Sequence, residues 1–285
     1  MKAAVSSLSE RLTSAHRQRR PLVMGIVNVT PDSFSDGGRY DRQELAVAHG
    51  RRLAGQGADI LDIGGESTRP GARAVELDEE LERVIPVIEA LTEQTDVPVS
   101  IDTSKPQVMH AAVAAGAVMI NDVNALQADG ALETAAGLGV IVCLMHMQGE
   151  PRTMQESPRY DDVVEDVRRF LATRLEACKS AGIGSHLLSV DPGFGFGKTL
   201  DHNLALLRHL GRFRELGVPV LSGISRKSMI GAITGRKDPD QRLAGSLAAA
   251  VISAIHGAAI VRVHDVADTV DALKVCSAVE ASALQ

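Results

Sequence analysis

The chain has 285 residues, a formal net charge of −6 and 45% hydrophobic residues. This length and composition fit a globular protein with a full core, built as one large α/β domain or as two smaller ones. The acidic balance excludes general affinity for nucleic acids or membranes. Aromatic residues make up only 2% of the chain, so aliphatic side chains must fill the core, as they do where helices pack on a parallel sheet.

The first 20 residues are polar and basic, and we expect them to form a helix or a loose arm ahead of a domain formed by residues 21–285. They contain no apolar core of the kind found in a signal peptide. The three cysteines, Cys143, Cys178 and Cys276, are widely spaced and include no C-x-x-C pair. This argues against a disulfide scaffold or a zinc site and fits a cytoplasmic protein. The longest apolar stretch, residues 243–261, contains serine and histidine, which fits a packed helix running into a strand and not a membrane span.

Short runs rich in valine and isoleucine alternate with amphipathic or alanine-rich segments along the whole chain. The runs are Leu22–Asn28, Asp59–Ile63, Val97–Ile101, Val118–Asn121, Val140–Met145, Leu187–Val190, Val218–Leu221 and Ala258–Val263. Helical segments between them include Arg42–Gln56, Asp78–Glu93, Gln107–Ala115, Tyr160–Ala181 and Gln241–His256. Such alternation predicts a parallel sheet. Eight repeats favour a single-domain (β/α)8 TIM barrel over a doubly wound open sheet.

Two connections are long, Asn28–Asp41 after the first strand and Ser67–Asp78 after the second. Long loops of this kind are candidates for mobile covers of a site. The first begins where an apolar run turns polar at Asn28. That change alone is compatible with an ordinary turn.

Every predicted strand ends in side chains able to bind a ligand. They are Asn28; Asp62 with Glu66–Pro70; Asp102–Ser104; Asn121 and Asp122; Met145 and His146; Asp191–Gly193; Ser225–Ser228; and Arg262–Asp265. Capping of the following helix explains one or two such positions, but not all eight. Because barrel enzymes carry their chemistry at the carboxyl ends of the strands, this pattern predicts an active site.

The individual strand ends differ in how strongly they point to function. Thr103 or Ser104 is expected to cap the next helix, which leaves Asp102 free to face the mouth of the barrel. A buried carboxylate there needs a ligand or a cation, and we favour a functional role for Asp102 and Asp191. For Asp62, Asp122 and Asp265 structural pairing is at least as plausible, and Glu66 could brace the mouth as easily as touch substrate.

Cationic groups gather at the ends of the last two strands. Arg262 and His264 are two residues apart on one strand, so both point the same way and suit a phosphate or diphosphate; the alternative is a salt bridge with Asp265 or Asp268. Residues 225–228 open a helix whose N-terminus favours an anion, with Lys227 as a point charge. Gly193–Thr199 fails the spacing of a P-loop and is interpreted as a glycine-rich loop that brings Phe194 close to a planar ligand.

Together these segments resemble the motifs of dihydropteroate synthase in order and spacing, from residue 22 to residue 268. The matching segments are Gly25–Gly38, Asp62–Gly71, Ser100–Pro106, Ile120–Asp122, Leu144–Gly149, Asp191–Lys198, Ser225–Ser228 and Arg262–Asp265. The resemblance implies a (β/α)8 barrel and a cytoplasmic, homodimeric transferase of folate biosynthesis that is a sulfonamide target. The enzyme would join (7,8-dihydropterin-6-yl)methyl diphosphate to 4-aminobenzoate and release diphosphate.

The resemblance also assigns roles to residues. It implies that Asp102, Asn121, Asp191 and Lys227 hold the pterin above Met145; that Asn28 binds Mg²⁺; that Arg262 and His264 hold the diphosphate near Thr68; and that Phe34, Pro70 and Ser228 surround 4-aminobenzoate. The catalytic set would be Asp102, Lys227, Arg262 and His264. In the family the C–O bond breaks first, and Asp102 is placed to stabilise the cationic pterin methylene. On this basis Arg262→Ala is expected to weaken turnover while leaving the fold intact.

Two other functions fit parts of this pattern. A pterin-binding methyltransferase has a similar pterin site but needs a corrinoid or zinc partner. A non-catalytic paralogue would bind pterin without turnover. The presence of Asn28, Arg262 and His264 argues against the first, and these residues together with Lys227 argue against the second.

Overall fold

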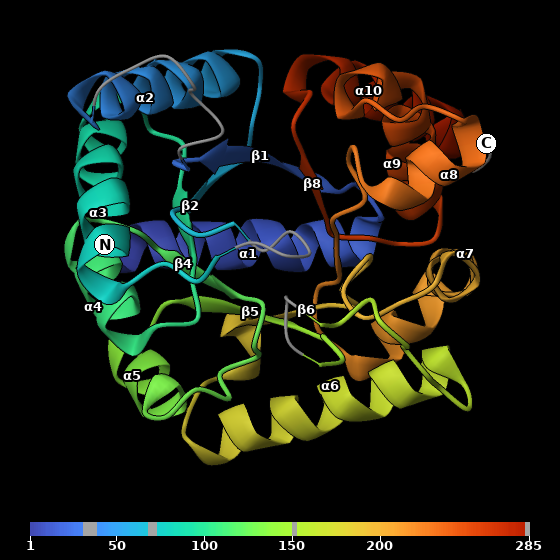
Figure 1. Cartoon of the computed structure of the whole chain (residues 1–285), viewed down its shortest axis with the longest axis horizontal. Coiled ribbons are helices and arrows are strands. Elements are labelled where there is room, and N and C mark those ends of the chain that lie inside the picture. Colours follow the sequence, from blue (N-terminus) through green and yellow to red (C-terminus); the bar gives the residue numbers. More distant parts are fainter. Residues whose placement is uncertain (31–38, 68–72, 150–152, 283–285) are drawn as a thin grey trace.

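The computed structural model describes residues 1–30, 39–67, 73–149 and 153–282. Helices form a ring around a central sheet of strands that curves toward closure (Figure 1). In the described part of the chain, no helix is long and apolar enough to cross a membrane.

Eight parallel strands form this sheet, in the order β6-β5-β4-β3-β2-β1-β8-β7. Their bounds are β1 Leu22–Asn28, β2 Ile60–Gly64, β3 Val99–Asp102, β4 Met119–Asp122, β5 Ile141–Met145, β6 Leu188–Asp191, β7 Leu221–Ser222 and β8 Ile260–Val263. The two ends of the sheet meet through a parallel bridge between Val190 and Val220, supported by the hydrogen bond from the Val190 amide to the Pro219 carbonyl. The prediction of a (β/α)8 barrel is therefore confirmed.

Helices follow the strands and cover the outside of the barrel (Figure 1). The α-helices are α1 Lys2–Gln18, α2 Arg39–Gly55, α3 Leu77–Gln94, α4 Pro106–Ala114, α5 Ala131–Leu138, α6 Val163–Ser180, α7 Leu200–Arg208, α8 Ser228–Thr234, α9 Leu243–Ile255 and α10 Val266–Ser282. Within the described residues, the short 3-10 helices are η2 Ser185–Leu187, η3 Leu210–Leu216 and η4 Pro239–Arg242.

The strands are almost wholly buried, as the continuous Val/Ile runs predicted. All residues of β2, β4, β5 and β6 are buried, because the barrel core fills one face and the helices cover the other. Most predicted strands begin one or two residues early. The largest difference is at β7, which has only two residues instead of the predicted Val218–Leu221, since Val220 contributes an isolated bridge and not a ladder.

Helix α1 packs across the amino-terminal end of the barrel, behind the strands in Figure 1. Leu8 and Leu12 are buried there, and the Ser9 hydroxyl donates to the carbonyl of His186 at 2.7 Å. Arg11 pairs with Asp59, which directly precedes β2. Of the two possibilities for the first 20 residues, helix or loose arm, the structure has the helix.

Candidate active site

The carboxyl ends of the first four strands bring the predicted polar residues into one row. The strand register places Asn28 opposite Gly64, Gly64 opposite Asp102, and Asp102 opposite Asn121. Because Gly64 has no side chain, the space above it is shared by its neighbours. A Cβ built on Gly64 would lie 3.7 Å from Oδ1 of Asn28 and 3.8 Å from Oδ2 of Asp102.

Arg262 of β8 lies between two carboxylates of this mouth. Its Nε donates to Oδ2 of Asp62 at 2.6 Å, and Nη2 donates to Oδ2 of Asp102 at 2.7 Å. The Asn121 amide also donates to Oδ2 of Asp62, at 3.1 Å. Asp62 is fully buried, and its Oδ1 has no hydrogen-bond partner among the described residues. The alternative expected from sequence, a bridge from Arg262 to Asp265 or Asp268, is therefore wrong.

Burial and the neighbouring charges set the charge state of Asp102. Burial raises the pKa of Asp102 to about 7, reinforced by Asp62 and opposed by Arg262. Burial would lower the pKa of Arg262, but Asp62 and Asp102 reverse this and raise it. The guanidinium is thus a permanent cation, whereas Asp102 changes charge near neutral pH.

Lys227 and Asp191 form the opposite side of the mouth. The Lys227 ammonium donates to the Phe194 carbonyl and lies 4.5 Å from the centre of the Phe196 ring. Burial lowers its pKa to about 8 against the attraction of Asp191. Asp191 accepts at Oδ1 from the Gly193 amide at 2.7 Å. Burial raises the pKa of Asp191, and Lys227 opposes this rise most strongly.

An apolar patch lies beside these charges. Met145, Met154 and Phe196 are buried together in a small cluster separate from the main core. Met145 ends β5 directly opposite Asp191 in the strand register. The position next to the mouth fits the predicted apolar surface beneath a flat ligand. Phe194, in contrast, is fully buried in the main core, so the prediction that it approaches a planar ligand is wrong; Phe196 is the ring that contacts Lys227.

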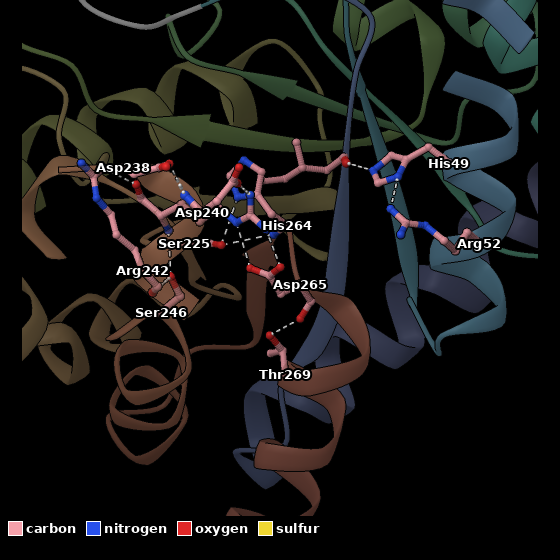
Figure 2. A network of polar contacts seen from close by, with 12 residues as sticks. His49, Arg52, Ser225, Asp238, Asp240, Arg242, Ser246, His264, Asp265 and Thr269 are labelled. Atoms are coloured by element: carbon pink, nitrogen blue, oxygen red, sulfur yellow. Dashed lines mark hydrogen bonds and ion pairs between the residues drawn. The ribbon is translucent and has the colours of Figure 1, made fainter. Parts of the chain in front are cut away.

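Side-chain hydrogen bonds connect the residues that follow β7 with those that follow β8. Figure 2 shows Ser225, His264 and Asp265 close to one another, and the Ser225 hydroxyl and His264 Nδ1 are 3.0 Å apart. Arg226 donates through Nε and Nη2 to both oxygens of Asp265, at 3.0 and 2.6 Å. Lys227 and His264 are thus held at fixed positions by the residues next to them. For Asp265 the structural alternative is confirmed.

Asp122 and Glu66 also make structural contacts. Asp122 accepts from the amides of Asn124 and Leu126, each at 2.7 Å, and from the Ser104 hydroxyl. Glu66 pairs with Lys105, which also pairs with the buried Glu80. In these contacts Asp122 shapes the loop after β4, and Glu66 braces the start of the loop after β2.

The expected cap of α4 is displaced by these contacts. Lys105 occupies the N-cap position, with no side-chain cap bond. The Thr103 hydroxyl donates to Glu80 at 2.7 Å and accepts from the Lys105 amide at 3.2 Å. The prediction that Thr103 or Ser104 caps the helix is therefore wrong, because buried carboxylates bind both hydroxyls.

Some predicted contacts fall elsewhere. Phe34, Thr68 and Pro70 lie outside the described residues. Ser228 is exposed at the first position of α8, directly after Lys227.

The sequence-based prediction missed Lys198, which is buried against His146. Its place after a glycine-rich loop was visible in the sequence, but its burial was not.

Comparison with known proteins agrees with this arrangement. A family model described as "Pterin binding enzyme" matches residues 24–264. The dihydropteroate synthase of Escherichia coli (strain K12) is 54% identical over 90% of this chain and 91% of that protein. The Haemophilus influenzae (strain ATCC 51907 / DSM 11121 / KW20 / Rd) dihydropteroate synthase is 52% identical over 90% of this chain and 94% of its own length.

Solved structures are similar over nearly the whole chain. The Xanthomonas albilineans dihydropteroate synthase with 4-aminobenzoic acid has a TM-score of 0.88 and 62% identity, covering 93% of this chain and 94% of that one. The same organism's enzyme in complex with 7,8-dihydropteroate has a TM-score of 0.85 and 58% identity, covering 93% and 95%. A family model over most of the chain, relatives above half identity and a matching fold lead to one conclusion: this chain belongs to the dihydropteroate synthase family of pterin-binding enzymes.

Proposed function

We propose that the mouth formed by Asp62, Asp102, Asp191, Lys227 and Arg262 is where this enzyme carries out the dihydropteroate synthase reaction. In that reaction (7,8-dihydropterin-6-yl)methyl diphosphate and 4-aminobenzoate give 7,8-dihydropteroate and diphosphate. The activity follows from family membership; the residue roles are the proposal. The observation that carries them is the placement of Arg262 between the fully buried Asp62 and the largely buried Asp102, in a mouth whose Lys227 lies over the Phe196 ring of the apolar cluster.

The pterin would bind across the mouth, with its polar edge toward the strand ends. Asp102, Asn121 and Asp191 offer carboxylate and amide groups that match the donors and acceptors of such a ring. Met145 and Phe196 supply the apolar surface against which the ring would lie. Lys227 would donate to the ring while its position is held by the Phe194 carbonyl.

The diphosphate would bind at the β8 side of the mouth. Arg262 uses Nε and Nη2 for Asp62 and Asp102, and its Nη1 makes no hydrogen bond within the described residues. That group is available for a phosphate oxygen. His264 follows at the end of the same strand, positioned by Ser225. In this proposal both residues would stabilise the charge that develops on the departing diphosphate.

Asn28 fits a magnesium ion that is completed by the substrate. Within the described residues no three His, Cys, Asp or Glu side chains gather as a metal site. Mg²⁺ usually takes only one or two protein oxygens plus phosphate oxygens and water. The amide oxygen of Asn28 lies beside the Asp102 carboxylate at the strand ends and makes no hydrogen bond to another described residue. Bound there, Mg²⁺ would neutralise diphosphate charge.

The chemistry then needs no strong base from the protein. The C–O bond breaks and its electron pair leaves with the diphosphate, so positive charge develops on the pterin methylene. Asp102, when ionised, would stabilise that charge. The amine of 4-aminobenzoate forms the new C–N bond and then loses a proton to solvent. The exposed Ser228 at the start of α8 would bind the carboxylate of this second substrate, at a helix N-terminus.

Diphosphate release with both substrates and Mg²⁺ tests the proposal. A pterin-binding methyltransferase would release no diphosphate, and a non-catalytic paralogue would bind the pterin without releasing diphosphate.

Asn28→Ala should raise the Mg²⁺ concentration needed for half-maximal activity by at least about tenfold. Asn28→Asp, which keeps an oxygen ligand, is the matched control. Unchanged magnesium dependence in Asn28→Ala would remove the assignment of this residue.

Three further properties belong to the same proposal. We propose that two copies associate through the alanine-rich α9, where Ile252 and Ile255 are exposed, and sedimentation velocity would measure the association. Sulfonamides should compete with 4-aminobenzoate, since a Yersinia pestis dihydropteroate synthase has been solved in complex with a sulfonamide drug. The free thiols of Cys143, Cys178 and Cys276 support a reducing, cytoplasmic location.

A further inference from the structure

Lys198 carries a buried ammonium group that has no role in the proposed chemistry. The residue is 3% exposed. Its Nζ lies 3.0 Å from Nδ1 of His146, 2.9 Å from the Phe196 carbonyl oxygen and 3.4 Å from the His146 carbonyl oxygen. Within the described residues it forms no ion pair at salt-bridge distance. Burying a cation against neutral acceptors alone is costly, so a compensating reason for its presence is expected.

The contacts of Lys198 fix the loop that carries the pterin-side groups. Lys198 and Lys227 donate to two carbonyls of the same loop, those of Phe196 and Phe194. Asn203 secures the loop from the other side, because its Oδ1 accepts from the Gly195 amide at 2.7 Å and its Nδ2 donates to the Lys198 carbonyl at 3.3 Å. The loop is therefore held between two lysines and one amide.

Lys198 also contacts His146, whose backbone is hydrogen-bonded to Asp191. The His146 amide donates to the Asp191 carbonyl at 3.0 Å. Gly193, whose amide donates to the Asp191 carboxylate, packs so closely on His146 that a Cβ would lie 1.9 Å from the His146 carbonyl oxygen. Direct contacts thus link Lys198, through His146 and Gly193, to Asp191 at the mouth.

The charges that surround Asp191 all favour its ionised form, and burial opposes them. Burial raises the pKa of Asp191, and this rise is opposed but not cancelled by Lys227 at the N-cap of α8, the Gly193 amide, Lys198 and Arg262 of β8. His146 of the β5 end is neutral, because burial lowers its pKa to about 3. The Cys143 thiol beneath is neutral as well, because burial raises its pKa.

We propose that Lys198 is a positioning residue for the pterin: its buried ammonium keeps Asp191 ionised, and its hydrogen bonds hold His146 and the glycine-rich loop around that carboxylate. Asp191 can then accept hydrogen bonds from the ring N–H groups. This inference rests on the proposed role of Asp191 in pterin binding. Lys198 itself is buried and would act through Asp191 and the loop, not by contact with the substrate.

The ionisation of Lys198 suits this role. Burial and Lys227 lower its pKa to about 7, while Asp191 opposes the shift. Lys198 is therefore charged on the acid side of neutrality, and its charge there opposes the protonation of Asp191. Removing the charge should raise the pKa of Asp191 and move the acid limb of pterin binding to higher pH.

Calorimetric titration with 6-hydroxymethylpterin between about pH 5 and about pH 9 tests this. Lys198→Gln keeps a neutral donor but removes the charge, and Lys198→Met removes both. Both should bind the pterin about tenfold more weakly near neutral pH, with the acid limb raised by about one pH unit. The KM for the pterin substrate should rise, and the KM for 4-aminobenzoate should change little. Lys274→Met removes an exposed lysine charge from α10 and serves as the control.

The outcomes separate the possible roles of Lys198. The Gln and Met variants could be less stable than the wild type while the pH at which their pterin binding declines stays unchanged. That result would show a merely structural role and overturn the proposal. If neither variant folds, Lys198→Arg provides the test, because it keeps the charge. This variant must bind the pterin with the wild-type pH dependence. A shift of its acid limb to another pH would contradict the proposal. Failure of the wild-type protein to bind the pterin or release diphosphate would instead overturn the proposed function.

Discussion

At the scale of single residues, Arg262 has the greatest influence on the site. One guanidinium compensates the fully buried Asp62 and the largely buried Asp102. Such pairs need not add to stability when intact, but breaking one leaves uncompensated charge in the interior. The same side chain is therefore expected to serve both folding and diphosphate binding. This differs from the expectation, drawn from sequence alone, that its removal would leave the fold intact.

Arg262→Ala should lower the free energy of unfolding by about 3–5 kcal/mol, because Asp62 and Asp102 lose their shared cation. Urea denaturation would measure this loss. Adding Asp62→Asn should restore part of the stability without restoring diphosphate release. A single variant as stable as the wild type would show that the carboxylates do not depend on this arginine.

Asp102 should impose an acid limb on activity. With burial raising its pKa to about 7, the carboxylate takes up a proton as the pH falls through neutrality and can no longer stabilise a cation. We expect kcat/KM for the pterin substrate, which reports the free enzyme, to fall below about pH 7. Asp102→Asn should lower kcat by about 10²-fold or more and remove the part of this limb that belongs to Asp102, leaving the part that belongs to Asp191. Asp129→Asn, at an exposed position, should leave the profile unchanged.

At the scale of elements, the junction between β5 and the loop after β6 is the most constrained part of the mouth. Gly193 and Gly217 both have positive φ, 72° and 76°. They differ in their surroundings: a Cβ on Gly193 would overlap the His146 carbonyl, whereas no atom of the described residues lies within 4 Å of a Cβ on Gly217. The pair separates backbone strain from steric overlap.

Gly217→Ala should cost only the strain of the left-handed conformation, about 1–2 kcal/mol. Gly193→Ala should cost roughly 3 kcal/mol or more, because His146 must also move. It should in addition weaken pterin binding, since the Gly193 amide donates to Asp191. Thermal denaturation and pterin titration of the two variants would measure both effects. Equal destabilisation would contradict the overlap.

At the scale of the whole molecule, the buried face of α1 and the polar strand ends lie at opposite ends of the barrel. The polar strand ends form the mouth, and α1 closes the amino-terminal end with Leu8 and Leu12 fully or almost fully buried. This separation is expected of the fold, in which loops at the carboxyl ends carry the chemistry. Substitutions in α1 should therefore act on stability alone.

Leu8→Ala should lower the free energy of unfolding by about 2–5 kcal/mol through the cavity it leaves. The exposed Leu45 of α2 provides the control, and Leu45→Ala should cost no more than about 0.5 kcal/mol. Both variants should release diphosphate with wild-type kcat at a temperature where they remain folded. A lowered kcat in folded Leu8→Ala would show coupling between the two ends.

The sequence by itself determined the architecture and most of the residues that lie at the mouth of the barrel. Local patterns encode both, because a buried parallel strand requires a continuous apolar run, and its carboxyl end is where the chain turns polar. Asn28, Asp102, Asn121 and Arg262 were therefore predicted at the mouth from their positions at strand ends. The structure brings Asp102, Asn121 and Arg262 together around Asp62.

Only the tertiary structure decided which charges meet. Arg262 pairs with carboxylates 200 and 160 residues away, and Arg226, not Arg262, takes Asp265. Lys198 showed no sign of burial in the sequence, and Phe194, which was predicted to approach a ligand, lies in the core, while Phe196 lies against Lys227. Pairing and burial depend on barrel closure and strand register, which bring distant segments into contact, and pKa shifts follow from that environment. Local sequence patterns therefore do not predict which side chains pair or which are buried.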